Sequence, residues 1–171
     1  MKKNGQLCQA SAQELLAAIM RGLLNRVKAK SPRFDEHIIE DVIVGCLSQV
    51  GEQGSDVARI AALLAGIPQE ACGCTVNQFC NAGLKAIMFG TQSIQVGNGD
   101  AVMCAGVELM SHYPIWCDIE IAKKAQLPVR FTERMGEIGM DVLQGLCAEK
   151  ISEDEGHTRE DLDRFGMWSM Q

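Results

Sequence analysis

The most constraining feature of the sequence is residues 71–96. An apolar, strand-like run at 71–76 is followed by a polar turn and by Cys80. In the next segment, residues 82–96, Lys85 is the only charged residue. Apolar side chains there fall on nearly every face of a helix, and a helix that is apolar all round belongs inside a sizeable domain. We therefore expect a buried central helix with Cys80 at its start.

The expected position of Cys80 has chemical consequences. The first turn of a helix has free N–H groups and the positive end of the helix dipole. A thiol at that position is expected to be more acidic than a free cysteine, and the thiolate is the nucleophilic form. The same N–H groups can hold an oxyanion after sulfur attacks a carbonyl. A free cysteine is also often a small core residue, so the position alone leaves both interpretations open.

Strands and helices alternate along the first two thirds of the chain. Apolar periodicity predicts helices, and short apolar or β-branched runs predict strands. The predicted elements are a helix over 11–29, a strand over 41–47, a helix over 55–64, a strand over 71–76, a helix over 82–96 and a strand over 101–106. This alternation indicates an α/β fold with a mainly parallel sheet. Functional residues of such sheets lie beyond the carboxyl ends of strands, so one site is expected to contain Cys80 and the 108–112 turn.

The pattern changes after Pro114. Residues 115–130 are expected to form a loop with one short helix, residues 135–150 a helix, and residues 152–156 an acidic turn. Thr158 and Asp161 form a capping-box pattern that begins a further helix. No finished cap follows that helix, so the sequence is expected to be a fragment.

Composition limits the classes of function. The chain has 171 residues, a net charge of −6 and eight cysteines. No basic patch typical of nucleic-acid binding is present, and no apolar run has the length of a membrane span. Without a secretory signal, the cysteines are expected to be reduced thiols. These features predict a soluble, cytoplasmic protein that binds neither nucleic acid nor membrane.

Other candidate groups are weaker. Cys72 and Cys74 are separated by one residue, and the three histidines lie far apart, so no metal site is expected. His112 is either a base near Cys80 or, more commonly for a loop histidine, a surface residue. Glu108 is expected to be a structural hydrogen-bonding carboxylate rather than an acid catalyst.

Several segments resemble the thiolase family. The run Val76-Asn77-Gln78-Phe79-Cys80-Asn81-Ala82-Gly83-Leu84-Lys85-Ala86-Ile87 resembles its acyl-enzyme signature. Residues 45–65 are similar to the preceding segment, and residues 105–114 to the second signature. Residues 135–136 and 158–165 are similar to helices of the family's loop domain. The matches occur in the family's order across nearly the whole chain.

This resemblance implies an organisation in two domains. Thiolases have two similar βαβαββ halves stacked as an αβαβα fold, with a lid-like loop domain inserted in the first half. Residues 1–114 would be the N-terminal α/β domain, and residues 115–171 part of the helical loop domain. The family's opening strand, which precedes the segment matching 3–7, has no counterpart here. Since that strand is central in the sheet, its loss is expected to leave a gap between its neighbours.

The resemblance also implies an activity. Thiolases are acyltransferases of fatty-acid metabolism that form or cleave 3-ketoacyl-coenzyme A (CoA). Cys80 would be the catalytic nucleophile that carries the acyl group, and Met135 would line the CoA site. Acyl-CoA and CoA are substrates, and no bound cofactor is implied. The full-length form would be a homo-oligomer, a dimer or tetramer, with strand 71–76 pairing across a two-fold axis.

Part of the family's machinery has no match in the sequence. The activating histidine, the second cysteine and the Asn and His that stabilise an enolate belong to the second half of thiolases. Ala105 replaces a usual glycine, and residues 137–139 replace a small-polar triplet. The chain alone is therefore expected to be inactive. The alternative is a non-catalytic remnant that binds acyl-CoA or dimerises. The related ketoacyl synthases share the fold, but the motifs flanking Cys80 fit thiolases better.

Overall fold

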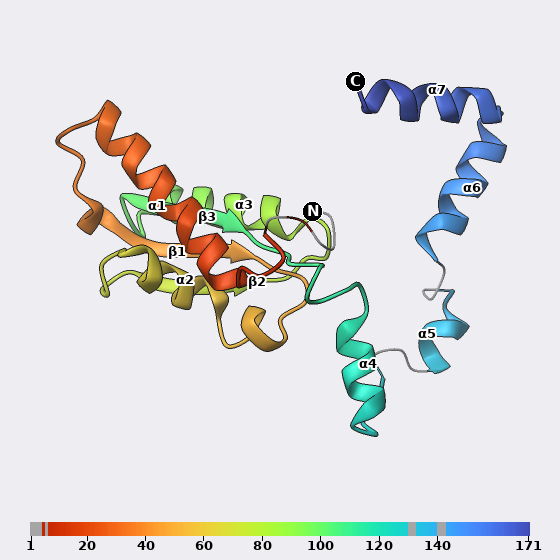
Figure 1. The fold of residues 1–171 in the computed structure, drawn as a ribbon, viewed down its shortest axis with the longest axis horizontal. Helices are drawn as coiled ribbons and strands as arrows, with labels where there is room; N and C mark the ends of the chain where they lie inside the picture. Colours follow the sequence, from red (N-terminus) through yellow and green to blue (C-terminus); the bar gives the residue numbers. More distant parts are fainter. Residues whose placement is uncertain (1–4, 6, 130–132, 140–142) are drawn as a thin grey trace. The chain divides into compact units, whose positions relative to one another are not determined.

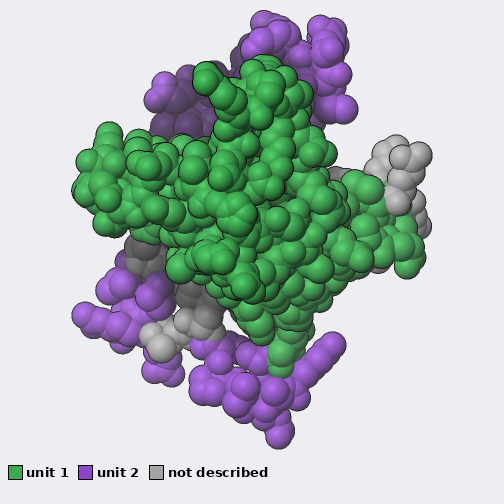
Figure 2. Space-filling view, turned by 90° about the vertical axis from the view of Figure 1, so that its left-hand side faces the viewer, with its two compact units in different colours: residues 1–121 green, residues 122–171 purple. Residues whose placement is uncertain are grey.

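The computed structural model describes residue 5 and residues 7–129, 133–139 and 143–171 (Figure 1). The chain divides into two compact units, residues 1–121 and 122–171 (Figure 2). The domain boundary expected after residue 114 stays a prediction. The helices that the structure describes include none with both the length and the apolar character needed to cross a membrane.

The first unit is built on a three-stranded parallel sheet. Its strands are β1 (Ile39–Gly45), β2 (Cys72–Val76) and β3 (Ala101–Gly106), in the order β2-β1-β3. Gly45 pairs with both Val76 and Gly106, so the three carboxyl ends lie level at one edge. The predicted α/β class and parallel sheet are confirmed.

The gap expected in the sheet is not present. β1 pairs directly with β3 from Ile39↔Ala101 to Gly45↔Gly106, with one register shift between Ile39 and Asp41. Unpaired backbone N–H and C=O groups are costly when buried. Direct pairing of the two strands satisfies these groups, which explains why the sheet is continuous.

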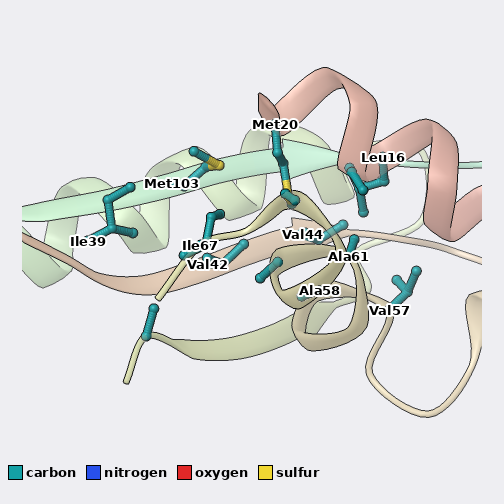
Figure 3. Close-up of a cluster of buried hydrophobic side chains, with 14 of the residues drawn as sticks. Leu16, Met20, Ile39, Val42, Val44, Val57, Ala58, Ala61, Ile67 and Met103 are labelled. Carbon is teal, nitrogen blue, oxygen red and sulfur yellow. The ribbon is translucent and has the colours of Figure 1, made fainter. Parts of the chain in front are cut away.

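Helices cover both faces of this sheet. α1 (Ala12–Lys30) and α2 (Val57–Ala65) pack on one face, and α3 (Ala82–Gln95) packs against β1 and β3 from the other. The main core lies under α1 and α2 (Figure 3). Its members include Leu16, Met20, Val42, Val44, Val57, Ala58, Ala61 and Met103. Two short 3-10 helices, η1 (Glu36–Ile38) and η2 (Gly51–Gln53), lie in the connections around β1.

The prediction that α3 is buried is wrong for this chain. Its buried residues are Ala82, Ala86 and Gly90, which form the face toward the sheet. The large apolar side chains on its other faces are exposed, at 56% for Leu84 and 54% for Ile87. A sheet buries one side of a helix, and no described element covers the opposite side. The apolar pattern of α3 therefore predicts that more of its surface is buried than the described part of the chain buries.

Helix starts follow the predicted capping patterns with one difference. Ser11 caps α1 by accepting from the Glu14 N–H at 3.1 Å. α2 is capped by Asp56, one residue later than expected, because the Asp56 side chain accepts from the Arg59 N–H. Both reciprocal bonds of the capping box join Thr158 and Asp161 at the start of α7 (Arg159–Ser169).

The helix predicted over 135–150 is wrong, because two helices occur there. α5 (Glu133–Glu137) ends before Gly139, whose φ of +67° suits glycine and interrupts a helix. α6 (Gln144–Asp154) follows, and it extends into the predicted acidic turn. Residues 140–142 lie outside the described residues. The short helix expected within 115–130 is α4 (Cys117–Lys124).

Candidate functional site

Cys80 lies where the sequence predicts it, between the end of β2 and the start of α3. Its side chain is exposed. Asn81 is the N-cap of α3, but no side chain accepts from the first turn there. The N–H groups that begin α3 are thus not capped by a side chain and lie directly beside the thiol residue in the sequence. Two of these N–H groups already have backbone partners, because Asn81 donates to the Gln78 carbonyl at 3.1 Å and Ala82 to the Phe79 carbonyl at 3.0 Å. The exposed thiol therefore lies beside the positive end of the helix dipole.

A tight turn leads into Cys80. Phe79 has a φ of +50°, a conformation that non-glycine residues seldom adopt. Its N–H donates to Asn77 Oδ1 at 2.8 Å. Its carbonyl accepts from the Ala82 N–H at 3.0 Å. The turn is therefore closed on both sides of Cys80.

Gly45 allows the start of α3 to approach the end of β1. A Cβ atom at this position would lie 2.4 Å from the Ala82 carbonyl carbon and 2.5 Å from the Gly83 nitrogen. Backbone atoms cannot yield to a side chain at such distances. A glycine in the last position of β1 is thus required for the helix start to lie against the carboxyl edge of the sheet.

Glu108 organises the loop after β1. Its carboxylate accepts from the Leu47 N–H at 2.8 Å and from the Ser48 N–H at 3.3 Å. Gln53 Nε2 donates to the same carboxylate at 3.2 Å. These bonds are those of a structural hydrogen-bonding carboxylate, as the sequence predicts. They join the segment after β3 to the segment after β1.

Sequence reasoning missed the part played by Gln53. Its side chain is fully buried, with 0% exposure. The amide donates to the Ser48 carbonyl at 2.7 Å and accepts from the Leu109 N–H at 2.5 Å. A buried amide with these bonds fixes the two loops relative to each other. The sequence gives no local signal for this, since Gln53 stands in a polar, glycine-rich segment that predicts only a loop.

The structure does not bring His112 to Cys80 as a base. Its Nδ1 lies 2.8 Å from Glu52 Oε1, and its Nε2 lies 2.7 Å from the Cys8 carbonyl oxygen. Both ring nitrogens are therefore engaged by the loop before α2 and by the N-terminal segment. The carbonyl of Cys8 and the carboxylate of Glu52 raise the pKa of His112 above its ordinary value. The histidine joins two segments of the first unit.

Three other thiols are less suited to be nucleophiles. Burial, aided by the nearby Glu108 carboxylate, raises the pKa of Cys46 to about 12. Burial also raises the pKa of Cys104, and partial burial with the charges of Asp41 and Asp56 raises that of Cys74. Since the thiolate is the reactive form, these thiols are disfavoured.

Met135 lies on α5, in the second unit, where it is half-buried. Nothing in the described structure tests its expected contact with CoA. Its role stays a prediction.

The sheet and the exposed thiol define an α/β protein with a candidate site at the carboxyl edge of a parallel sheet. The family model of the thiolase N-terminal domain matches residues 1–171, so this chain belongs to the thiolase family. The resemblance expected from the sequence is confirmed by this match.

Similar proteins carry thiolase names. A 3-ketoacyl-CoA thiolase of Idiomarina loihiensis is 38% identical over 164 residues, which cover 96% of this chain and 39% of that protein. The 3-oxoadipyl-CoA/3-oxo-5,6-dehydrosuberyl-CoA thiolase of Escherichia coli is 36% identical over 177 residues, covering 98% of this chain and 43% of that protein. The chain thus spans about two fifths of the length of these relatives.

A solved structure supports the fold. The crystal structure of the Bacillus anthracis acetyl-CoA acetyltransferase aligns with a TM-score of 0.56 and 32% sequence identity. The alignment covers 63% of this chain and 26% of that one. The similarity therefore concerns part of the larger protein.

Proposed function

We propose that this chain supplies the acyl-cysteine part of a thiolase, with Cys80 as the nucleophile. The observation that carries the proposal is the exposed Cys80 thiol directly before the start of α3, which the Asn81 side chain does not cap. The relatives named 3-ketoacyl-CoA thiolase support a 3-ketoacyl-CoA as the substrate. The chain covers only part of these relatives, so this activity is proposed for the complete enzyme.

The proposed reaction consists of two acyl transfers. In the first, the Cys80 thiolate bonds to the 3-keto carbon, and the bond between that carbon and the α-carbon breaks. The electron pair leaves on the α-carbon, which takes a proton and departs as acetyl-CoA. In the second, the thiolate of CoA attacks the acyl carbon and the Cys80 sulfur leaves. The positive end of the α3 dipole is suited to stabilise the oxyanion of each step.

The remaining roles extend beyond the first unit. By the family resemblance, Met135 contributes to the surface that binds CoA. Proton transfer is assigned to second-half residues of the complete enzyme, which have no match among residues 1–171. We therefore expect the chain alone to be acylated without turning over.

We also propose a homo-oligomeric enzyme in a reducing compartment such as the cytoplasm. β2 is an edge strand of the described sheet, and such edges favour pairing with another chain. All eight cysteines are described, and each is a free thiol. Both features support the proposal.

A second candidate is a non-catalytic thiolase-like subunit that binds acyl-CoA or dimerises. The exposed apolar residues of α3 and the free edge of β2 favour it, because both are surfaces suited to association. This candidate does not require a reactive thiol at Cys80.

Limited alkylation tests the two candidates. The folded chain is treated with substoichiometric iodoacetamide, and the labelled thiols are identified by peptide mapping. The proposal predicts that Cys80 is labelled before Cys46, Cys74 and Cys104. Labelling of any of these three first would contradict a nucleophilic Cys80 and favour the non-catalytic candidate.

A further inference from the structure

One side chain connects the ends of two strands beside Cys80. Asn77 is the first residue after β2. Its Nδ2 donates to the Leu47 carbonyl at 3.0 Å, and its Oδ1 accepts from the Phe79 N–H at 2.8 Å. Both polar atoms of the amide are used, and the two partners lie on opposite sides of it in the chain. Asn77 therefore joins the loop after β1 to the turn that carries Cys80.

Leu47 is held through its N–H as well as through its carbonyl. Its N–H donates to Glu108 Oε2 at 2.8 Å. Glu108 follows β3, so bonds run in order from Glu108 to Leu47, from Leu47 to Asn77 and from Asn77 to Phe79. These hydrogen bonds link the segments that follow β3, β1 and β2. The last of them is made by Phe79, the residue before Cys80. None of its members was identified from the sequence as acting on the thiol.

The turn requires such support. Phe79 holds a φ of +50°, which is unfavourable for a residue with a Cβ atom. Its side chain is 62% exposed, so burial in the core does not impose this conformation. The bond from its N–H to Asn77 favours the observed backbone, and the bond from Asn77 to Leu47 fixes the amide that accepts it.

We propose that Asn77 is a positioning residue, which orients Cys80 relative to the positive end of α3. The inference rests on the proposed role of Cys80 as an acyl-carrying nucleophile. Asn77 acts through the Phe79 peptide and does not itself touch the acyl group. Glu108 fixes the far end of the same chain of bonds through Leu47.

Two reactions of Cys80 depend differently on this geometry. Attack on a carbonyl develops an oxyanion beside the positive end of α3, so the rate depends on how the sulfur and the helix start are aligned. Alkylation by iodoacetamide forms no oxyanion and depends on thiolate content and access. A positioning residue should therefore affect acylation more than alkylation, whereas general loosening of the fold would affect both.

The test uses the full chain with p-nitrophenyl acetate and, separately, iodoacetamide. In the acylation, the Cys80 sulfur bonds to the acetyl carbon, the ester C–O bond breaks and p-nitrophenolate leaves. Each product is mapped to its cysteine by mass spectrometry. For Asn77→Ala we expect Cys80 acetylation to slow about tenfold or more, because small misplacements of reacting groups have large effects on rate. Cys80 alkylation should change less than about threefold, since it needs no aligned donors.

Thr91→Ala is the control. Thr91 lies on α3 away from its start, and among the bonds described its hydroxyl donates to the Ile87 carbonyl at 2.9 Å. Thr91→Ala should leave both rates near those of the parent. Protection of the buried Cys46 reports folding in every variant. Should Asn77→Ala expose Cys46, Asn77→Ser decides, because its neutral hydroxyl can accept from the Phe79 N–H but is shorter than the amide that reaches Leu47. Slower acetylation with unchanged alkylation would support the role, and parent rates in both reactions would overturn it.

A double variant tests the chain of bonds itself. Asn77 and Glu108 share Leu47 as a partner, so Asn77→Ala and Glu108→Gln should slow acetylation together by less than the product of their separate effects. Effects that multiply fully would overturn the connection through Leu47. Equal slowing of acetylation and alkylation, or no slowing, would overturn the role of Asn77 and leave a nucleophilic Cys80 intact. Failure of the parent chain to acetylate at Cys80 would instead overturn the proposed function, and the positioning role with it.

Discussion

His112 Nδ1 lies 2.8 Å from Glu52 Oε1, and the same imidazole reaches the Cys8 carbonyl oxygen through Nε2 at 2.7 Å. Both partners are hydrogen-bond acceptors, and only the protonated imidazolium donates from both nitrogens. The Glu52 N–H in turn donates to the Tyr113 hydroxyl at 3.1 Å. The arrangement ties the N-terminal segment and η2 to the loop after β3.

This pair predicts a pH dependence of stability. The bonds raise the pKa of His112 above 6.5 in the folded state, so the folded state holds the proton more tightly than the unfolded state. The contribution of these bonds to the free energy of unfolding is complete below pH 6.5. It is lost as the pH rises through the pKa that His112 has in the folded state. The urea midpoint of the parent chain should therefore fall relative to His112→Gln as the pH increases across this range.

His37→Gln provides the control for that measurement, because His37 is described as donating only through its backbone N–H, to Asp35. It should retain the parent's pH dependence. A difference between parent and His112→Gln that grows with pH would contradict the protonated arrangement.

Gly45 predicts a steric effect. Gly45→Ala places a methyl group against the backbone of Ala82 and Gly83, so α3 must move away from β1. Forcing extra atoms into packed structure costs about 1–3 kcal/mol of unfolding free energy. Urea denaturation measures the loss.

Gly22→Ala is the matched control for Gly45→Ala. Gly22 lies within α1, and a Cβ atom there would meet nothing within 4 Å. Alanine should stabilise that helix by about 0.5–1 kcal/mol. Equal effects of the two substitutions would contradict a close approach between β1 and α3.

The edge of the sheet predicts self-association. β2 pairs only with β1 in the described sheet and leaves its other edge free. We expect light scattering to show species larger than a monomer, and Cys72→Lys to reduce them, since edge lysines oppose strand pairing. Leu63→Lys changes an exposed residue on α2 and should have a smaller effect. A clean monomer of the parent chain would contradict the prediction.

We propose that this chain supplies the nucleophile and that the second half of the complete enzyme supplies proton transfer. This predicts no turnover by the chain alone. Incubation with acetoacetyl-CoA and CoA should give no sustained formation of acetyl-CoA, because proton transfer is assigned to residues outside this sequence. Chromatography of the CoA esters measures this directly. Sustained thiolysis that disappears in Cys80→Ser would show that residues 1–171 contain a general base.

Local patterns predicted much of the fold. Apolar periodicity identified α1, α2 and α3, and short apolar runs identified the strands, because both signals depend on nearby residues. The position of Cys80 before α3 followed from the same patterns. One helix was predicted over 135–150 despite its glycines, but α5 ends before Gly139, whose φ is +67°.

Features that depend on distant residues were not predicted. The burial of α3 depends on what covers its outer side, which its own sequence does not describe. The direct pairing of β1 with β3 depends on which neighbours are present. Gln53 and Asn77 act through partners in other loops, so their bonds became evident only in the structure.

The central claim is that Cys80 carries the acyl group. The most direct measurement is to incubate the folded chain with acetyl-CoA, digest it at low pH and map the acetylated residue by mass spectrometry. The account predicts a thioester on Cys80, lost in Cys80→Ser and retained in Cys74→Ser, whose thiol has a raised pKa. Acetyl groups on other cysteines with Cys80 unmodified, or unchanged acetylation of Cys80→Ser, would contradict it.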